Sequence, residues 1–102
     1  MIKVKVLKNK DEIREITIKG HALFDDYGKD IVCAAVSTLA ITTINNIIVL
    51  DDSLRVQEDA GFIKISVLSK TNVNQKLLNN MVNMLKELEG QYPKNIEIRN
   101  ED

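Results

Sequence analysis

The sequence predicts an α+β fold in which two helices pack on a largely antiparallel sheet. Three observations point to it: short segments of alternating apolar and polar residues, two longer apolar segments with helical spacing, and turn residues between them. The expected order of elements is ββαββαβ. With 102 residues, 44% of them hydrophobic, the chain is long enough for one compact core, and we expect a single domain over residues 1–102.

The first two strands are expected on either side of a turn at residues 9–11. Apolar residues alternate with lysines over residues 2–7, which is the period of a strand with one buried face. Ile16 and Ile18 alternate with Thr17 and Lys19, so a second strand would return antiparallel and end near residue 20.

A helix is expected next, from residue 31 to about residue 50. Asp30 is a candidate N-cap, because its carboxylate can accept hydrogen bonds from the amides of the first turn, and Cys33 would then lie in that turn. The apolar residues nearly encircle the helix axis and leave a narrow polar stripe at residues 38, 42, 45 and 46. This pattern predicts a mostly buried helix.

The second half of the chain predicts a hairpin, a helix and a last strand. Residues 51–53 end the first helix, and residues 54–57 lead through Asp59-Ala60-Gly61 into a strand over residues 62–67. Apolar residues then recur at helical spacing over residues 77–88, with Gly90 as the expected stop and Pro93 preventing continuation. Ile96 and Ile98 indicate the last strand.

Composition excludes several classes of protein. The net charge is −1 and the basic residues are scattered, which argues against direct binding of nucleic acid. The apolar segment of residues 31–50 is interrupted by Ser, Thr and Asn, so we expect no membrane span, and the N-terminus lacks the apolar region of a signal peptide. One cysteine excludes an intramolecular disulfide and is compatible with a reducing compartment. We therefore expect a cytoplasmic protein.

The single cysteine, Cys33, and the single histidine, His21, lie twelve residues apart in one segment. A thiol and an imidazole suffice for covalent catalysis, because the imidazole can take the proton of the thiol, and a thiolate is favoured at a helix N-terminus. The residues alone leave two alternatives open: Cys33 as a small buried apolar residue and His21 as an exposed residue at a strand end.

Two further residues can assist such a dyad. Asp30 can orient the imidazole, although it is equally suited to cap the helix. Ser37 follows Cys33 by one helical turn and shares its face, so its hydroxyl can bind a dyad member or the substrate, or can bond back to its own helix.

The loop between His21 and the helix supplies the candidate substrate contacts. Gly20 and Gly28 bracket it and can act as hinges of a lid or as ordinary turn residues, and Phe24 and Tyr27 can contact an apolar substrate or pack on their own scaffold. One Cys and one His fall short of a zinc site, and no phosphate-binding glycine motif is present, so we expect no metal and no cofactor.

The segment Gly20-His21-Ala22, then Gly28, then Asp30-Ile31-Val32-Cys33-Ala34-Ala35-Val36-Ser37 closely resembles the ribosomal-processing cysteine protease family, Prp, of Firmicutes and related bacteria. The size and the ββαββαβ order fit that family over the whole chain. The resemblance implies Cys33 as the nucleophile and His21 as the base, with Asp30 and Ser37 at further motif positions.

The resemblance also implies a task and an assembly. The family removes an N-terminal extension from a large-subunit ribosomal protein, with the cut after two phenylalanines, and its members are expected to be homodimers. From the residues alone, two other classes stay open: a non-catalytic module for ribosome assembly or ribosomal-protein binding, and a redox-responsive thiol, which the lack of a second cysteine weakens.

Overall fold

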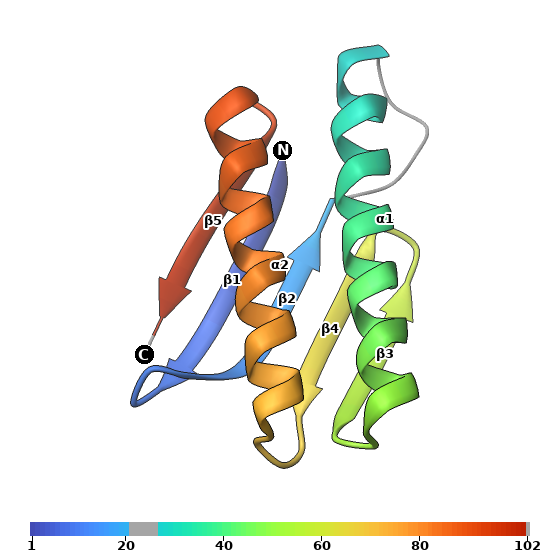
Figure 1. Ribbon diagram of the computed structural model, residues 1–102. Coiled ribbons are helices and arrows are strands. Elements are labelled where there is room, and N and C mark those ends of the chain that lie inside the picture. The colour runs from blue at the N-terminus through green and yellow to red at the C-terminus, as the bar shows by residue number, and fades with distance from the viewer. Residues whose placement is uncertain (21–26, 102) are drawn as a thin grey trace.

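The computed structural model describes the backbone of residues 1–20 and 27–101, and the side chains of residues 1–20 and 31–101. Its elements are, in chain order, β1 (Ile2–Asn9), β2 (Glu12–Lys19), α1 (Tyr27–Leu50), β3 (Leu54–Asp59), β4 (Phe62–Val67), α2 (Asn72–Gln91) and β5 (Ile96–Glu101). The strands form one sheet in the order β3-β4-β2-β1-β5, and Figure 1 shows both helices on the same face of it. The predicted α+β class and the predicted order of elements are confirmed.

The sheet is antiparallel except where β5 joins it. β1 pairs with β2 antiparallel and with β5 parallel, and β4 pairs antiparallel with both β2 and β3. Lys10 and Asp11 connect β1 to β2 with positive φ angles of 53° and 65°, the conformation that a two-residue hairpin turn requires. The parallel pairing places Ile96, the first residue of β5, beside Ile2, the first residue of β1.

The core lies between the sheet and the two helices. Alternation along β1 sends Val4 and Val6 into it and Lys3 and Lys5 to the opposite, uncovered face of the sheet. The buried apolar side chains form one cluster: Ile2, Val4, Val6, Ile13, Ile16, Ile18, Val32, Cys33, Val36, Ala40, Ile44, Ile47, Ile63, Ile65, Leu78, Met81, Val82, Leu85 and Ile96.

The helix α1 begins earlier than the sequence predicts. It starts at Tyr27, so Asp30 is its fourth residue and not its N-cap, and Cys33 lies in its second turn rather than its first. The segment before Asp30 contains no proline, and Gly28 within a helix costs only about 0.5–1 kcal/mol, which packing of the later turns offsets. The predicted start of the helix, at residue 31, was therefore four residues too late.

The prediction that α1 is mostly buried also needs correction. Thr38 and Thr42 are exposed as expected, but Ile48 and Val49 are 56% and 83% exposed as well. The segment Ile31–Leu50 has a mean hydropathy of 1.8 and is long and apolar enough to cross a membrane by length and composition only, a test that a buried core helix also passes; the expectation that it spans no membrane stays a prediction. Its inner side packs on the sheet, as that of a core helix does.

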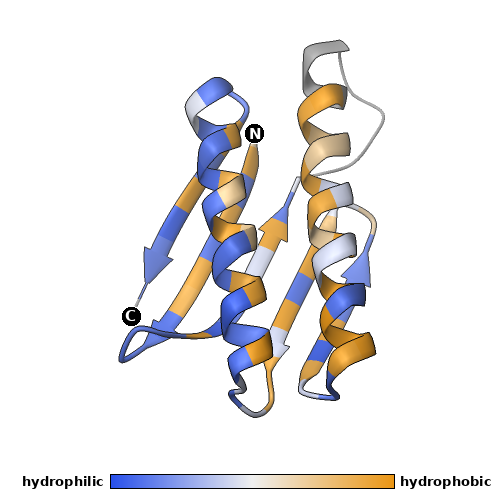
Figure 2. Cartoon of the chain, in the orientation of Figure 1, coloured by the Kyte–Doolittle hydropathy of each residue, from blue (hydrophilic) through white to orange (hydrophobic). Residues whose placement is uncertain are grey.

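The second helix has well-defined ends. The Thr71 hydroxyl accepts a hydrogen bond from the Asn74 N–H at 3.0 Å, and the Asn74 side chain accepts one from the Thr71 N–H at 3.2 Å, which forms a capping box. Gly90 lies within the helix, so the predicted stop there was wrong; the helix ends at Gln91 because Pro93 disfavours helical backbone at Tyr92. Figure 2 shows mostly hydrophilic residues on the outer side of α2 and hydrophobic residues facing outward on α1.

Candidate active site

The thiol of Cys33 meets the end of β2. Cys33 is 3% exposed, and its Sγ donates a hydrogen bond to the Gly20 carbonyl oxygen at 3.8 Å. Two segments thirteen residues apart in the sequence are thus in contact: the second turn of α1 and the residue that follows β2. Gly20 directly precedes His21 in the sequence. The described part of the chain therefore brings the candidate nucleophile to the segment that carries the candidate base.

Gly20 is held in a conformation that suits only glycine. Its φ is +89°, and a Cβ atom there would lie 2.9 Å from the Met1 carbonyl oxygen. Its N–H donates to the Gly61 carbonyl oxygen at 2.8 Å. These contacts fix the position of the Gly20 carbonyl oxygen, which accepts the hydrogen bond from the Cys33 thiol. Gly20 therefore helps to position the thiol, and its predicted role as a hinge stays a prediction.

A small cavity of about 30 Å³ lies beside the thiol. It has room for roughly one water molecule, so the described side chains form the wall of a site rather than a cleft of substrate size. The residues that line it are Met1, Ile2, Gly20, Val32, Cys33, Lys94 and Asn95.

Sequence reasoning missed two of the segments that form this wall, the start of β1 and the connection before β5. The Ile2 N–H donates to the Asn95 carbonyl oxygen at 2.8 Å, and this bond brings the two segments together. Lys94 and Asn95, from the connection before β5, both line the cavity. The two segments meet because β1 and β5 pair in parallel, and no local sequence motif predicts that pairing.

Ser37 lies one turn after Cys33 and carries a buried hydroxyl. Its Oγ is buried and forms no hydrogen bond with any residue of 1–20 or 31–101. Thr43, on the same helix, shows the alternative, because its Oγ1 donates to the Leu39 carbonyl oxygen at 2.8 Å. Within the described residues, Ser37 therefore does not bond back to its own helix and keeps its hydrogen-bonding capacity for another group.

The remaining predicted site residues are placed only in part. Tyr27, Gly28 and Asp30 lie in the first turn of α1, and their side chains are outside the described residues. Because Gly28 is helical, its interpretation as a loop hinge was wrong. His21 and Phe24 lie outside the described residues altogether.

The earlier start of α1 changes the position of Cys33 relative to the N-terminal end of the helix. The unpaired amides of an α-helix belong to its first four residues, here 27–30, and the field of the helix dipole weakens beyond that turn. Cys33, the seventh residue, lies past these amides, so the thiolate gains less from the helix terminus than the sequence predicted.

A larger hollow of about 380 Å³ lies on the uncovered face of the sheet, and Cys33 does not line it. Its wall alternates cations and carboxylates, several of them ion-paired, such as Lys64 with Glu15 at 3.4 Å. Across residues 1–20 and 27–101, no group of three His, Cys, Asp or Glu residues is placed to hold a metal ion.

The α+β fold, with the Cys33 thiol of α1 against the residue that follows β2, fits the class of cysteine peptidases that the sequence predicts. The model of the family described as cysteine protease Prp matches residues 1–97, and the chain belongs to that family. It is 30% identical over 103 residues to the ribosomal processing cysteine protease Prp of Staphylococcus aureus, with 96% of this chain and 97% of the relative covered. The Bacillus subtilis protein of the same name is 27% identical over 107 residues, with 96% of each chain covered.

Solved structures extend the likeness to the fold. A Staphylococcus aureus Prp in complex with a covalently linked product peptide is similar at a TM-score of 0.89 and 28% identity, covering 99% of this chain and 100% of that one. The same relative in complex with a substrate peptide has a TM-score of 0.87, 27% identity and the same coverage. The predicted family and enzyme class, a cysteine protease, are confirmed.

Proposed function

We propose that this protease removes the N-terminal extension of a large-subunit ribosomal protein, with Cys33 as nucleophile and His21 as base. The names of the relatives support the ribosomal substrate, and the covalently linked product peptide in one solved relative supports covalent catalysis. The observation in this chain that carries the proposal is the contact between the Cys33 thiol and Gly20, the neighbour of His21.

The proposed reaction follows the chemistry of a thiol and an imidazole. His21 takes the thiol proton, and the Cys33 sulfur attacks the scissile carbonyl carbon. The imidazolium then gives its proton to the leaving amine as the C–N bond breaks, which leaves a thioester. Water, deprotonated by the imidazole, hydrolyses the thioester and restores the thiol. Backbone amides in the first turn of α1 are the proposed donors to the oxyanion.

The other predicted residues have assisting roles in this proposal. Asp30 orients the imidazole, and Ser37 donates to a dyad member or to the substrate through the hydroxyl that is unused in the described residues. Gly20, Phe24, Tyr27 and Gly28 contact the substrate peptide. We further propose that the protein acts in the cytoplasm as a homodimer, without a cofactor, a membrane or direct contact with nucleic acid.

The test is incubation of the purified protein with the extended ribosomal protein, followed by intact-mass measurement. We expect one cut after the two phenylalanines, and a loss of at least about a thousandfold in rate for Cys33→Ala, Cys33→Ser and His21→Ala. Ser37→Ala should slow the cut, whereas Thr43→Ala is the matched control, because the Thr43 hydroxyl is already bonded to its own helix.

Two outcomes would refute the proposal. Cys33→Ser that retained most of the activity would exclude the thiol as nucleophile. A substrate that stays uncut but co-elutes equally with wild type and Cys33→Ala would instead identify a non-catalytic binding module.

A further inference from the structure

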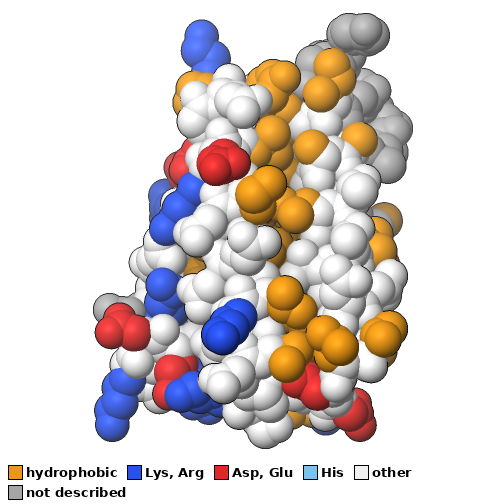
Figure 3. Space-filling model, viewed as in Figure 1, with side chains coloured by type: hydrophobic (Ala, Val, Ile, Leu, Met, Phe, Trp, Pro, Cys, Tyr) orange, Lys and Arg blue, Asp and Glu red, His pale blue; other side chains and the backbone are white. Residues whose placement is uncertain are grey.

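The face of the sheet that the helices leave uncovered gathers positive charge. Strand pairing brings basic residues from β1, β2, β4 and β5 together there, although they are scattered in the sequence and the net charge of the chain is −1. The hollow of about 380 Å³ on this face is lined by five cations, Lys3, Lys5, Lys19, Lys64 and Arg99, and by three carboxylates, Glu15, Glu97 and Glu101. Figure 3 shows the opposite side of the molecule, where hydrophobic side chains gather between α1 and α2. An anionic ligand therefore finds its complement on the uncovered face.

Ion pairs account for three of the five cations. The pairs are Lys5 Nζ with Glu101 Oε1 at 3.8 Å, Lys64 Nζ with Glu15 Oε1 at 3.4 Å, and Arg99 Nε with Glu97 Oε1 at 3.1 Å. All three carboxylates of the hollow are thereby used. The two remaining ammonium groups, those of Lys3 and Lys19, are exposed and form no ion pair or hydrogen bond with another described residue.

Lys3 and Lys19 lie directly opposite each other in the sheet. The antiparallel register of β1 and β2 pairs them, and the side chains of such a pair leave the same face with Cβ atoms about 4.5–5.5 Å apart. Like charges directly opposite each other repel and destabilise the sheet. On its other side Lys3 lies opposite Glu97 of β5, whose carboxylate is paired with Arg99. An anion held between Lys3 and Lys19 would replace their repulsion with two attractions.

Phe62 adds an aromatic ring beside these two lysines. It lines the same hollow and lies opposite Lys19 on β4, so Phe62, Lys19 and Lys3 form one row across three strands, which we call the cationic row. Neighbouring strands are about 4.8 Å apart, so the row spans roughly 10 Å from Phe62 to Lys3. Aromatic rings stack on nucleobases, and lysine is a common phosphate binder. The cationic row therefore offers a ring for a base and two cations for phosphates.

We propose that the uncovered face of the sheet binds a free nucleotide, with its phosphates between Lys3 and Lys19 and its base against Phe62. The size of the hollow supports a small ligand, because small-molecule pockets have volumes of about 300–1,000 Å³. The charges support it too: a long nucleic-acid backbone laid across the face would meet the three carboxylates, whereas a compact ligand needs only the cationic row. Cys33 does not line the hollow, so this inference goes beyond the proposed proteolysis and does not rest on it.

Calorimetric titration of the whole chain with adenosine diphosphate (ADP) at low ionic strength is the test, because salt screens exposed charges. Wild type should bind one ADP per chain, and Lys3→Gln and Lys19→Gln should each weaken binding at least about tenfold. Both variants should melt no lower than wild type without ligand, because each removes the like-charge pair, so lost binding would not reflect unfolding. Lys76→Gln, at an exposed position on α2, changes the net charge equally and is the matched control, which should bind ADP as wild type does.

Phe62→Leu separates the contribution of the base from that of the phosphates. The variant keeps an apolar side chain but removes the ring, so we expect ADP to bind about fivefold more weakly or worse. Pyrophosphate has no base, and its affinity should be the same for Phe62→Leu and wild type. In wild type, ADP should bind more tightly than pyrophosphate.

Four results would overturn the proposal. A wild type that does not bind ADP refutes the site. Equal weakening in Lys76→Gln shows attraction by the overall charge and not by the cationic row. Pyrophosphate that binds wild type as tightly as ADP refutes the role of Phe62 and with it the nucleotide. A single-stranded RNA that binds more tightly than ADP, with an affinity that rises with its length, assigns the face to nucleic acid instead.

Discussion

Gly20 gives the sharpest prediction at the scale of one residue. In Gly20→Ala the new Cβ would lie 2.9 Å from the Met1 carbonyl oxygen at a φ of +89°. An L-residue in left-handed backbone costs about 1–2 kcal/mol, and the contact adds to this cost. We expect the free energy of unfolding to fall by at least that amount, measured by denaturant titration. Cleavage of the substrate should also slow, because the residue-20 carbonyl that contacts the Cys33 thiol moves.

Gly90→Ala is the matched control for this substitution. Gly90 lies within α2, and a Cβ there would have no neighbour within 4 Å. Alanine should stabilise the protein by about 0.5–1 kcal/mol through helix propensity and leave proteolysis unchanged. Equal stability of Gly20→Ala and wild type would contradict the close approach of Gly20 to Met1.

Glu12 gives a prediction about pH. Lys70 Nζ donates to Glu12 Oε1 at 2.8 Å, and this hydrogen bond holds the pKa of the Glu12 carboxyl below its usual value. A lowered pKa in the folded state stabilises the protein above the unfolded pKa of about 4.3, and the gain is lost as the pH falls through the folded pKa. Wild type should therefore melt slightly above Glu12→Gln at neutral pH, and the two should converge in acid.

The effect at Glu12 should be small, because the pair is exposed to solvent and screened. Glu58→Gln, at an exposed position on β3, is the control and should match wild type at both pH values. A difference in melting temperature between wild type and Glu12→Gln that grows as the pH falls would contradict this prediction.

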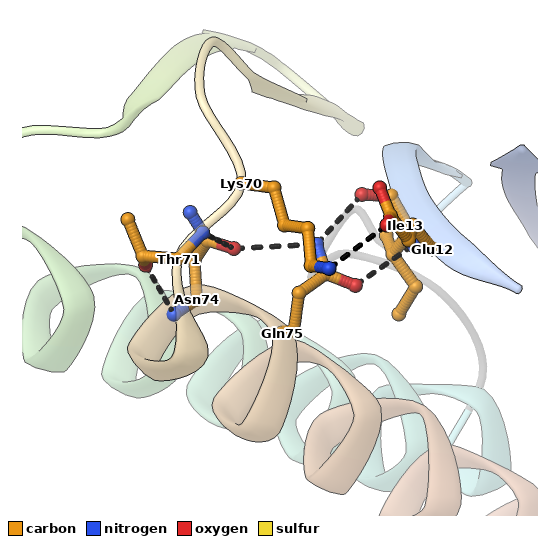
Figure 4. Close-up of polar contacts among 6 residues, drawn as sticks. All are labelled: Glu12, Ile13, Lys70, Thr71, Asn74 and Gln75. Carbon is orange, nitrogen blue, oxygen red and sulfur yellow. Dashed lines mark hydrogen bonds and ion pairs between the residues drawn. The ribbon is translucent and has the colours of Figure 1, made fainter.

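At the scale of elements, Gln75 acts as a short extension of the sheet. The pairing of β4 with β2 ends at Glu15 and Ser66, so Ile13 lies beyond it. The Ile13 N–H donates to Gln75 Oε1 at 2.9 Å, and Gln75 Nε2 donates to the Ile13 carbonyl oxygen at 2.9 Å (Figure 4). The side-chain amide thus satisfies both backbone groups and ties α2 to β2.

Gln75→Ala should lower the free energy of unfolding by about 1–3 kcal/mol, because it leaves a backbone donor and an acceptor without a partner. Gln75→Glu keeps only the acceptor and sets a carboxylate oxygen against the Ile13 carbonyl, so it should be no better in denaturant titration. Gln57→Ala, at an exposed position on β3, is the control and should change stability little. Similar stability of Gln75→Ala and Gln57→Ala would refute the role of this amide.

The elements show what local pattern can and cannot predict. Alternation identified β1 and β4, because each has buried residues on one face, and the turn residues between β3 and β4 identified their hairpin. The start of α1 and the end of α2 were misplaced, since Asp30 and Gly90 are residues that favour helix ends but tolerate helix interiors when neighbouring turns pack well. A residue that favours helix ends therefore predicts the end of a helix less reliably than the packing of the neighbouring turns determines it.

The site shows the same limit. Helical spacing alone places Ser37 on the face of Cys33, and the sequence predicted this correctly. The contacts of Met1, Lys94 and Asn95 at the cavity depend on β5 crossing to the far side of β1, a pairing between the two ends of the chain. No local pattern encodes the partner of an edge strand, so the sequence could not predict these contacts.

At the scale of the whole molecule, one core holds the sheet and both helices together. Ile47 of α1 is fully buried in the same cluster as Ile65 of β4 and Met81 of α2. Because the described chain has a single apolar cluster, loss of packing at any one element weakens the others, and we expect one cooperative unfolding transition.

Ile47→Ala tests this cooperativity. Removing a fully buried isoleucine side chain costs about 2–5 kcal/mol, a large share of the about 5–15 kcal/mol that stabilises a typical domain. The midpoint of denaturation should fall steeply while helix and sheet signals still unfold together. Asn46→Ala, the exposed neighbour, should be nearly neutral. If helical circular dichroism were lost before the tertiary signal of the sheet in Ile47→Ala, α1 would dock on an independently stable sheet, and the thiol would be held by a helix less firmly fixed than the strand it contacts.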